Sequence, residues 1–141
     1  MQSNDVQVVR LYTSSVAGGT LDDTPAEVGG NPRATFYLMV QADAGDEAGD
    51  NKLNYTLTIS ARSTSGGATT FAKQNLKEEV GDVGKDWKQV TPGQNDGYVK
   101  QSTIAIRSAD FPGGDVYEFI ATLRLESGRR TTVRSNEFYT F

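Results

Sequence analysis

Four carboxylates crowd into one short stretch of the chain, where their oxygens could bind a cation. The stretch spans residues 42–51 and contains Asp43, Asp46, Glu47 and Asp50. Calcium prefers oxygen ligands that a loop supplies, although the spacing here differs from that of an EF-hand loop. The stretch therefore predicts a calcium site, and it fits equally an acidic, solvated connection between two strands.

Several aromatic or soft side chains could recognise a partner at the surface. Alternation along the sequence does not place the following residues on an inner face: Tyr37, Met39, Trp87, Tyr98 and Tyr139. Exposed aromatic rings on a flat sheet can stack on sugars or contact another protein. Trp87 and Tyr98 are therefore candidates for a ligand or partner surface. Burial under loops or under a neighbouring subunit is the competing explanation.

The residue types that most enzymes need are missing. The chain contains no cysteine and no histidine, which excludes thiolate nucleophiles and the side chain best suited to proton transfer near neutral pH. The serines lie in turns without the strand-to-helix elbow that exposes a nucleophile, and Gly18-Gly19 lacks the lysine of a phosphate loop. A carboxylate pair could serve a glycosidase-like reaction, but nothing in the spacing supports one. The sequence predicts a protein that is not an enzyme.

Length and charge narrow the remaining classes. A chain of 141 residues without internal repeats has the size of one domain, and we assign residues 1–141 to it. The net charge of -4 argues against a nucleic-acid partner, which would require clustered lysine and arginine. No apolar run is long enough for membrane insertion, and the polar start does not resemble a signal peptide.

The clearest predicted strand, which would help to position the candidate site residues, covers residues 115–125. Its period-two apolar side consists of Tyr117, Phe119, Ala121, Leu123 and Leu125. Glu118, Thr122 and Arg124 take the other side, as in a half-buried strand. We expect it to be the central strand of an all-β sandwich.

Other segments alternate in the same way and complete the sandwich. The predicted strands cover residues 5–13, 33–41, 53–61, 71–76, 86–90, 98–108 and 131–141. In the first of them the apolar phase slips between Val8 and Val9, which predicts a β-bulge or a switch of the strand between sheets. Residues 77–84 fit a strand or a helical turn, and residues 126–130 a hairpin. Seven to nine strands favour two packed sheets, with a barrel as the alternative.

The end of the chain resembles immunoglobulin-like and fibronectin-III-like domains. The resemblance covers residues 102–141 and is carried by Asp110-Phe111-Pro112-Gly113-Gly114-Asp115-Val116-Tyr117 followed by Ser135-Asn136. It implies an antiparallel β-sandwich in which the Tyr117 hydroxyl bonds back to nearby backbone. It also implies that residues 42–51, residues 91–97 and the Arg129-Arg130 hairpin gather at one end as a charge-complementary rim for binding.

These expectations favour a non-catalytic structural or protein-interaction module. The first strand and residues 138–141 are candidate edges for a protein partner or for self-association. The alternative is a carbohydrate-binding module that uses exposed aromatic rings, with or without calcium. The sequence leaves the location open and favours an extracellular, cell-surface or virion setting.

Overall fold

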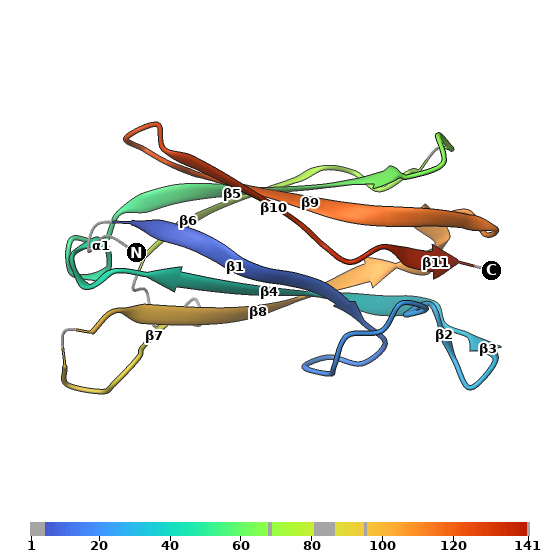
Figure 1. Cartoon of the computed structure of the whole chain (residues 1–141), viewed down its shortest axis with the longest axis horizontal. Helices are drawn as coiled ribbons and strands as arrows, with labels where there is room; N and C mark the ends of the chain where they lie inside the picture. Colours follow the sequence, from blue (N-terminus) through green and yellow to red (C-terminus); the bar gives the residue numbers. More distant parts are fainter. Residues whose placement is uncertain (1–4, 68, 81–86, 95, 141) are drawn as a thin grey trace.

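Two antiparallel sheets packed face to face form the fold (Figure 1). The computed structural model describes residues 5–67, 69–80, 87–94 and 96–140. The four-stranded sheet has the order β1 (Val6–Ser14), β4 (Thr35–Ala44), β8 (Tyr98–Arg107), β7 (Trp87–Gln89). The five-stranded sheet has the order β10 (Arg130–Arg134), β9 (Asp115–Leu125), β5 (Asn54–Ser63), β6 (Gln74–Glu79), with β11 (Phe138–Thr140) also paired to β9. The predicted all-β sandwich is confirmed.

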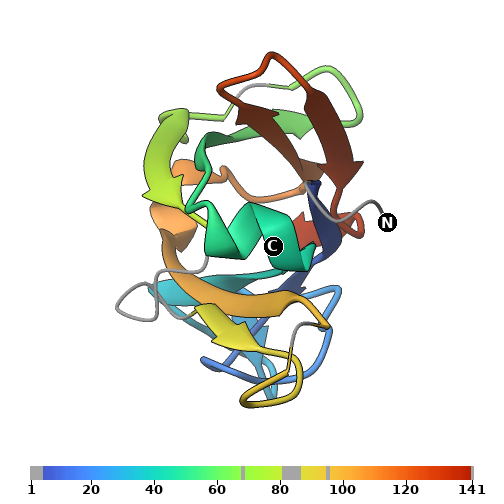
Figure 2. The same cartoon turned by 90° about the vertical axis from the view of Figure 1, so that its left-hand side faces the viewer.

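Short elements complete the described part of the chain. A two-stranded hairpin joins β2 (Glu27–Val28) to β3 (Asn31–Pro32), and the helical elements are α1 (Asp46–Asp50) and the 3-10 turn η2 (Ser108–Asp110). Figure 2 looks onto the end of the sandwich that carries α1, which lies across the gap between the sheets. In the described residues, no helix is long and apolar enough to cross a membrane.

The interior is built from the alternating side chains of both sheets. On β9, Tyr117, Phe119 and Ala121 are fully buried, as the period-two pattern predicted. Phe36 of β4 faces them, with its ring centroid 6.4 Å from that of Phe119. Phe138 stacks on Phe119 at 5.2 Å. The core therefore holds most of the aromatic surface of the chain, which in β-proteins contributes strongly to stability.

The predicted bulge in the first strand is present. The register of β1 against β4 shifts between Val8 and Arg10. Val9 is consequently 44% exposed, while Val8 and Leu11 on either side are buried. The extra residue lets Leu11 face the core together with Val6 and Val8, because it reverses the phase of alternation.

The predicted strand 131–141 is divided, which corrects the expectation of one continuous strand. Residues 135–137 separate β10 from β11. Within the break, Ser135 Oγ accepts the Phe119 N–H at 2.9 Å, and Asn136 Oδ1 accepts the Thr13 N–H at 3.0 Å. Asn136 therefore links the two sheets, while Ser135 keeps a backbone bond to β9, its N–H donating to the Phe119 carbonyl at 2.9 Å. Phe141 lies outside the described residues.

The segment between β5 and β8 differs most from the prediction. The strand expected over residues 71–76 is found as β6, from Gln74 to Glu79. Part of residues 77–84 and the start of the strand predicted from Asp86 lie outside the described residues. At the opposite corner, the Tyr117 hydroxyl donates to the Pro112 carbonyl at 2.7 Å, as expected.

Candidate binding surface

The acidic stretch after β4 does not assemble a metal site. Among the described residues, no group of three or more acidic, histidine or cysteine side chains could hold a metal ion. Asp43 belongs to β4, whereas Asp46, Glu47 and Asp50 belong to α1. Asp50 Oδ1 instead accepts a hydrogen bond of 2.9 Å from the Tyr98 hydroxyl. The prediction of calcium binding gains no support from this arrangement.

Tyr98 therefore supports α1 rather than standing free as an exposed ring. Its side chain is half-buried and packs against the core. Its ring contacts Gly49 so closely that a Cβ at this position would overlap it. The hydrogen bond to Asp50 raises the pKa of the Tyr98 hydroxyl, with burial adding to the effect.

Trp87 lies inside the molecule, so the expectation that its ring offers an exposed stacking surface is wrong. Its side chain is 0% exposed. The indole Nε1 donates to the Tyr55 hydroxyl at 3.2 Å, and the two rings meet edge to face at 6.2 Å. Burial of an indole with its N–H satisfied is the usual structural use of tryptophan.

A buried polar cluster surrounds that tryptophan, and no pattern in the sequence predicted it. Glu78 Oε2 accepts a 2.7 Å hydrogen bond from the Tyr55 hydroxyl and pairs with Lys100 Nζ. The Lys100 side chain is 8% exposed and that of Glu78 15%. The charges and donors of this cluster satisfy one another, as buried polar groups generally must. Trp87, Tyr55, Glu78 and Lys100 thus join β7, β5, β6 and β8.

The hairpin between β9 and β10 carries the two predicted arginines in different surroundings. It lies at the same end of the sandwich as α1 and the connection between β7 and β8, as expected (Figure 1). Arg129 Nη2 lies 3.3 Å from Asp5 Oδ2. Arg130 begins β10 directly opposite Arg124 of β9. The rim therefore places an acid beside Arg129, while Arg130 belongs to the outer face of the five-stranded sheet.

That outer face is polar from strand to strand. Along β9 and β5, outward residues alternate with buried ones, so the strand register identifies which outward residues are neighbours. One cross-strand row contains Arg130, Arg124, Thr56 and Lys77. The next contains Thr132, Thr122, Thr58 and Asn75. Sequence analysis placed Arg124 on the outward side of its strand but could not identify its neighbours.

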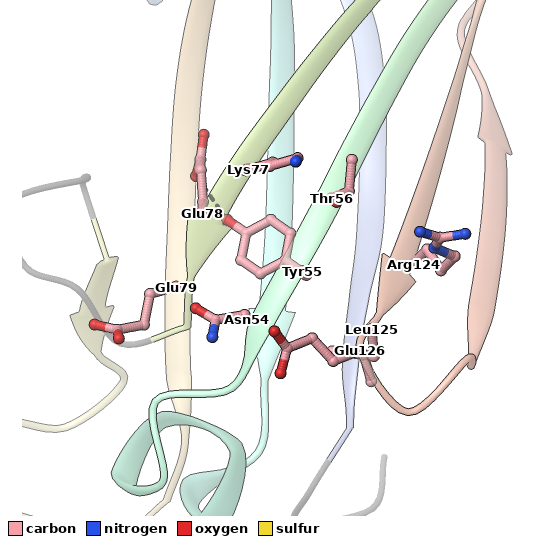
Figure 3. A pocket seen from close by; sticks show the side chains of 9 residues that line it. All are labelled: Asn54, Tyr55, Thr56, Lys77, Glu78, Glu79, Arg124, Leu125 and Glu126. Atoms are coloured by element: carbon pink, nitrogen blue, oxygen red, sulfur yellow. Dashed lines mark hydrogen bonds between the residues drawn. The ribbon is translucent and has the colours of Figure 1, made fainter.

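Two shallow depressions adjoin each other on this face. We call the larger, of about 590 Å³, the mixed-charge depression; Figure 3 shows its lining of Asn54, Tyr55, Thr56, Lys77, Glu78, Glu79, Arg124, Leu125 and Glu126. Lys77 and Arg124 lie on either side of Thr56 in this view. The smaller, of about 350 Å³, we call the arginine depression, and it is lined by Thr56, Thr58, Asn75, Thr122, Arg124 and Arg130.

Another pair of arginines on the same face surrounds a carboxylate. Glu118 Oε1 lies 2.6 Å from Arg62 Nε and 3.6 Å from Arg134 Nη1. The Glu118 side chain is 8% exposed. Arg124 and Arg130, by contrast, make no ion pair within the described residues. The face therefore holds one arginine pair that shares a carboxylate and one open pair.

A serine and aspartate cluster near the opposite end stabilises a turn. Ser63 Oγ donates to Asp115 Oδ2 at 2.8 Å, and Ser65 Oγ also donates to this carboxylate. The hydrogen bond from Ser65, followed by those from the Val116 N–H and Ser63, lowers the pKa of Asp115. The two serines and the Asp115 carboxylate therefore hold the turn to the start of β9.

Comparison with known proteins identified no relative of this chain. No protein family, no curated protein and no solved structure matches this chain. Function is therefore inferred from the geometry of the molecule itself.

Proposed function

We propose that this chain is a non-catalytic recognition module, a structural or interaction component that presents the outer face of its five-stranded sheet to a partner. The open arginine pair carries the proposal. Arg124 and Arg130 are exposed, lie directly opposite one another and have no acidic partner among the described residues. Charged residues held together without internal compensation are typical of surfaces that meet a partner of opposite charge.

Recognition through this face is better supported than strand addition at the predicted edges. In β1, the Thr13 N–H is bound by Asn136 and the Thr13 carbonyl by the Asp22 N–H, at 2.9 Å. In β11, the Tyr139 N–H donates to the Asp23 carbonyl at 2.7 Å. Because these backbone groups already have partners, they are not available to extend a sheet into another subunit.

We further infer an immunoglobulin-like arrangement within the β-sandwich. The order β1-β4-β8-β7 corresponds to strands A, B, E and D of such domains, and β10-β9-β5 to G, F and C. The bond from Tyr117 to Pro112 fits the tyrosine corner at the start of strand F. Trp87 departs from the pattern, since these domains keep their tryptophan on strand C.

The proposal that the chain is not catalytic is supported by the two carboxylates that lie in polar clusters, because both are bonded to other side chains of the fold. Glu78 is committed to Lys100 and Tyr55, and Asp115 to Ser63 and Ser65. Each of these carboxylates therefore already has a partner within the fold, which speaks against a role as a general acid or base.

A panel of chromogenic glycosides, esters and phosphate esters tests this part of the proposal. We expect no turnover by the purified chain. Turnover that falls by about a hundredfold or more in Glu78→Gln or Asp115→Asn, the loss typical of a missing acid or base, would overturn it. Unfolding curves of both variants provide the control for folding.

Carbohydrate binding is a second candidate, and one observation favours it. All the residues around the arginine depression are polar or charged, with hydroxyl and amide groups between the two arginines. Hydroxyl-rich ligands can exchange hydrogen bonds with such a lining without an aromatic platform.

A further inference from the structure

We infer that the arginine depression binds the carboxylate or sulfate groups of an acidic polysaccharide. The inference rests on the proposed recognition by the outer sheet face and names the chemistry of the partner. Its basis is the juxtaposition of Arg124 and Arg130 above a floor of threonine and asparagine side chains.

The two arginines are placed where like charge is unfavourable. Directly opposed like charges on neighbouring strands destabilise a sheet. Arg124 faces Arg130 on one side and Thr56 on the other, and Lys77 follows across Thr56. This concentration of positive charge stands out on a chain whose net charge is -4. A bound anion would convert the repulsion into attraction.

The molecule itself shows which anion this face can hold. Glu118 lies between Arg62 and Arg134 on the same outer surface, and Arg62 donates to it at 2.6 Å. Guanidinium groups bind carboxylate, sulfate and phosphate oxygens through the same fork of N–H donors. Arg124 and Arg130 offer the same pair of donors, and their carboxylate has to come from another molecule.

The lining of the depression distinguishes a sugar chain from a protein partner. Thr58 Oγ1 donates to Asn75 Oδ1 at 2.8 Å, which leaves the amide group of Asn75 as a donor at the floor. Thr56 and Thr122 add hydroxyl groups. The cores of protein interfaces are rich in apolar and aromatic side chains, and the lining of this depression has none. A hydroxyl-rich chain bearing acidic groups matches both the donors and the charge.

The adjoining mixed-charge depression limits where the anion can lie. Glu79 and Glu126 line it together with Arg124 (Figure 3). These carboxylates repel an acidic ligand, whereas the lining of the arginine depression contains no acid. The acidic groups should therefore lie over Arg124 and Arg130, and neutral hydroxyl groups over the end near Glu126.

Binding of polygalacturonate and dextran sulfate to the full chain tests the inference, with neutral dextran and poly-glutamate as comparison probes. Isothermal titration calorimetry at low salt should detect both acidic polysaccharides. The variant Arg124→Thr/Arg130→Thr should bind them about tenfold or more weakly, since it removes two charge-assisted contacts. The control Arg33→Thr/Arg107→Thr removes the same charge from exposed arginines outside the arginine depression and should stay within about twofold of the parent.

Each result has a defined consequence. Selective loss in the Arg124/Arg130 variant supports the inference for whichever of the two polymers binds. Equal losses in both double variants, or binding of neither acidic polysaccharide, would overturn it. Poly-glutamate binding more tightly than both polysaccharides would make the ligand an acidic polypeptide and would overturn the sugar assignment. These failures leave the proposed non-catalytic role standing, because that role is contradicted by turnover in the substrate panel.

Discussion

Two arginine pairs on one sheet face differ in a single respect. Arg62 and Arg134 enclose Glu118, whereas Arg124 and Arg130 have no carboxylate within the described residues. The first pair is a closed structural contact, because both of its arginines lie against the same carboxylate within the chain. The second pair has no such partner among the described residues, and we propose that it binds another molecule. The comparison teaches that residue type alone does not distinguish a structural arginine from one that could bind a partner. The distinction depends on whether a carboxylate of the same chain lies beside the arginine.

The largest expected change in the free energy of unfolding comes from the buried ion pair of Glu78 with Lys100, which is closed in the same sense. Lys100→Met should lower the free energy of unfolding by about 2–4 kcal/mol, because it leaves the Glu78 charge in a largely buried position. Urea unfolding measures the loss. The double variant Glu78→Gln/Lys100→Met should recover much of it, because it removes both charges. A loss below about 1 kcal/mol in the single variant would mean that water replaces the lysine.

Removing Glu118 would turn the closed arginine pair into an open one. Glu118→Ala should lower the free energy of unfolding by about 1 kcal/mol, a value discounted because both arginines are exposed. Thermal and urea unfolding measure the effect. Glu137→Ala, at an exposed glutamate without an ion pair in the described residues, is the matched control and should change little. Equal behaviour of the two variants would remove the distinction between the pairs.

The core of this fold was predictable because its pattern is local. The alternation in residues 115–125 identified the buried face of β9, and the slipped phase beside Val9 identified the bulge. Both features depend on the period of two along a single strand. Neither requires knowledge of which strands become neighbours.

The surface features were not predictable from the sequence, because they depend on which strands become neighbours. Arg124 meets Thr56 and Lys77 only because β9 pairs with β5 and β5 with β6, and this order is a property of the whole sandwich. Trp87 was misplaced because β7 has three residues, too few to reveal an alternation. The pairing of Glu78 with Lys100 spans the two sheets and leaves no periodic trace in the sequence.

Single arginine substitutions should give small effects of opposite sign on the two pairs. Arg124→Thr removes one of two opposed like charges and should raise the free energy of unfolding by about 0.2–1 kcal/mol. Arg62→Thr makes the same chemical change on the same face and should lower it, because Glu118 loses its 2.6 Å partner. Urea unfolding of both variants in parallel, at low salt, measures the difference. Losses of equal size would show that Arg124 has an internal partner after all.

The smallest expected effect is on the pH dependence of stability. Alkaline pH should weaken the contribution of the tyrosine contacts and leave that of the arginine pairs unchanged. Arginine stays charged throughout this range, whereas the pKa of Tyr98 is raised above 10.0 by its bond to Asp50. In the unfolded chain this hydroxyl loses its proton first, so its contribution to stability is complete below about pH 10 and disappears as pH rises through the folded pKa. Tyr98→Phe should therefore reduce the fall in stability above that pH. The decline should not vanish, because burial also raises the pKa of Tyr117. Urea unfolding across the alkaline range measures both slopes, and identical slopes for Tyr98→Phe and the parent chain would show that the Asp50 contact does not persist in solution.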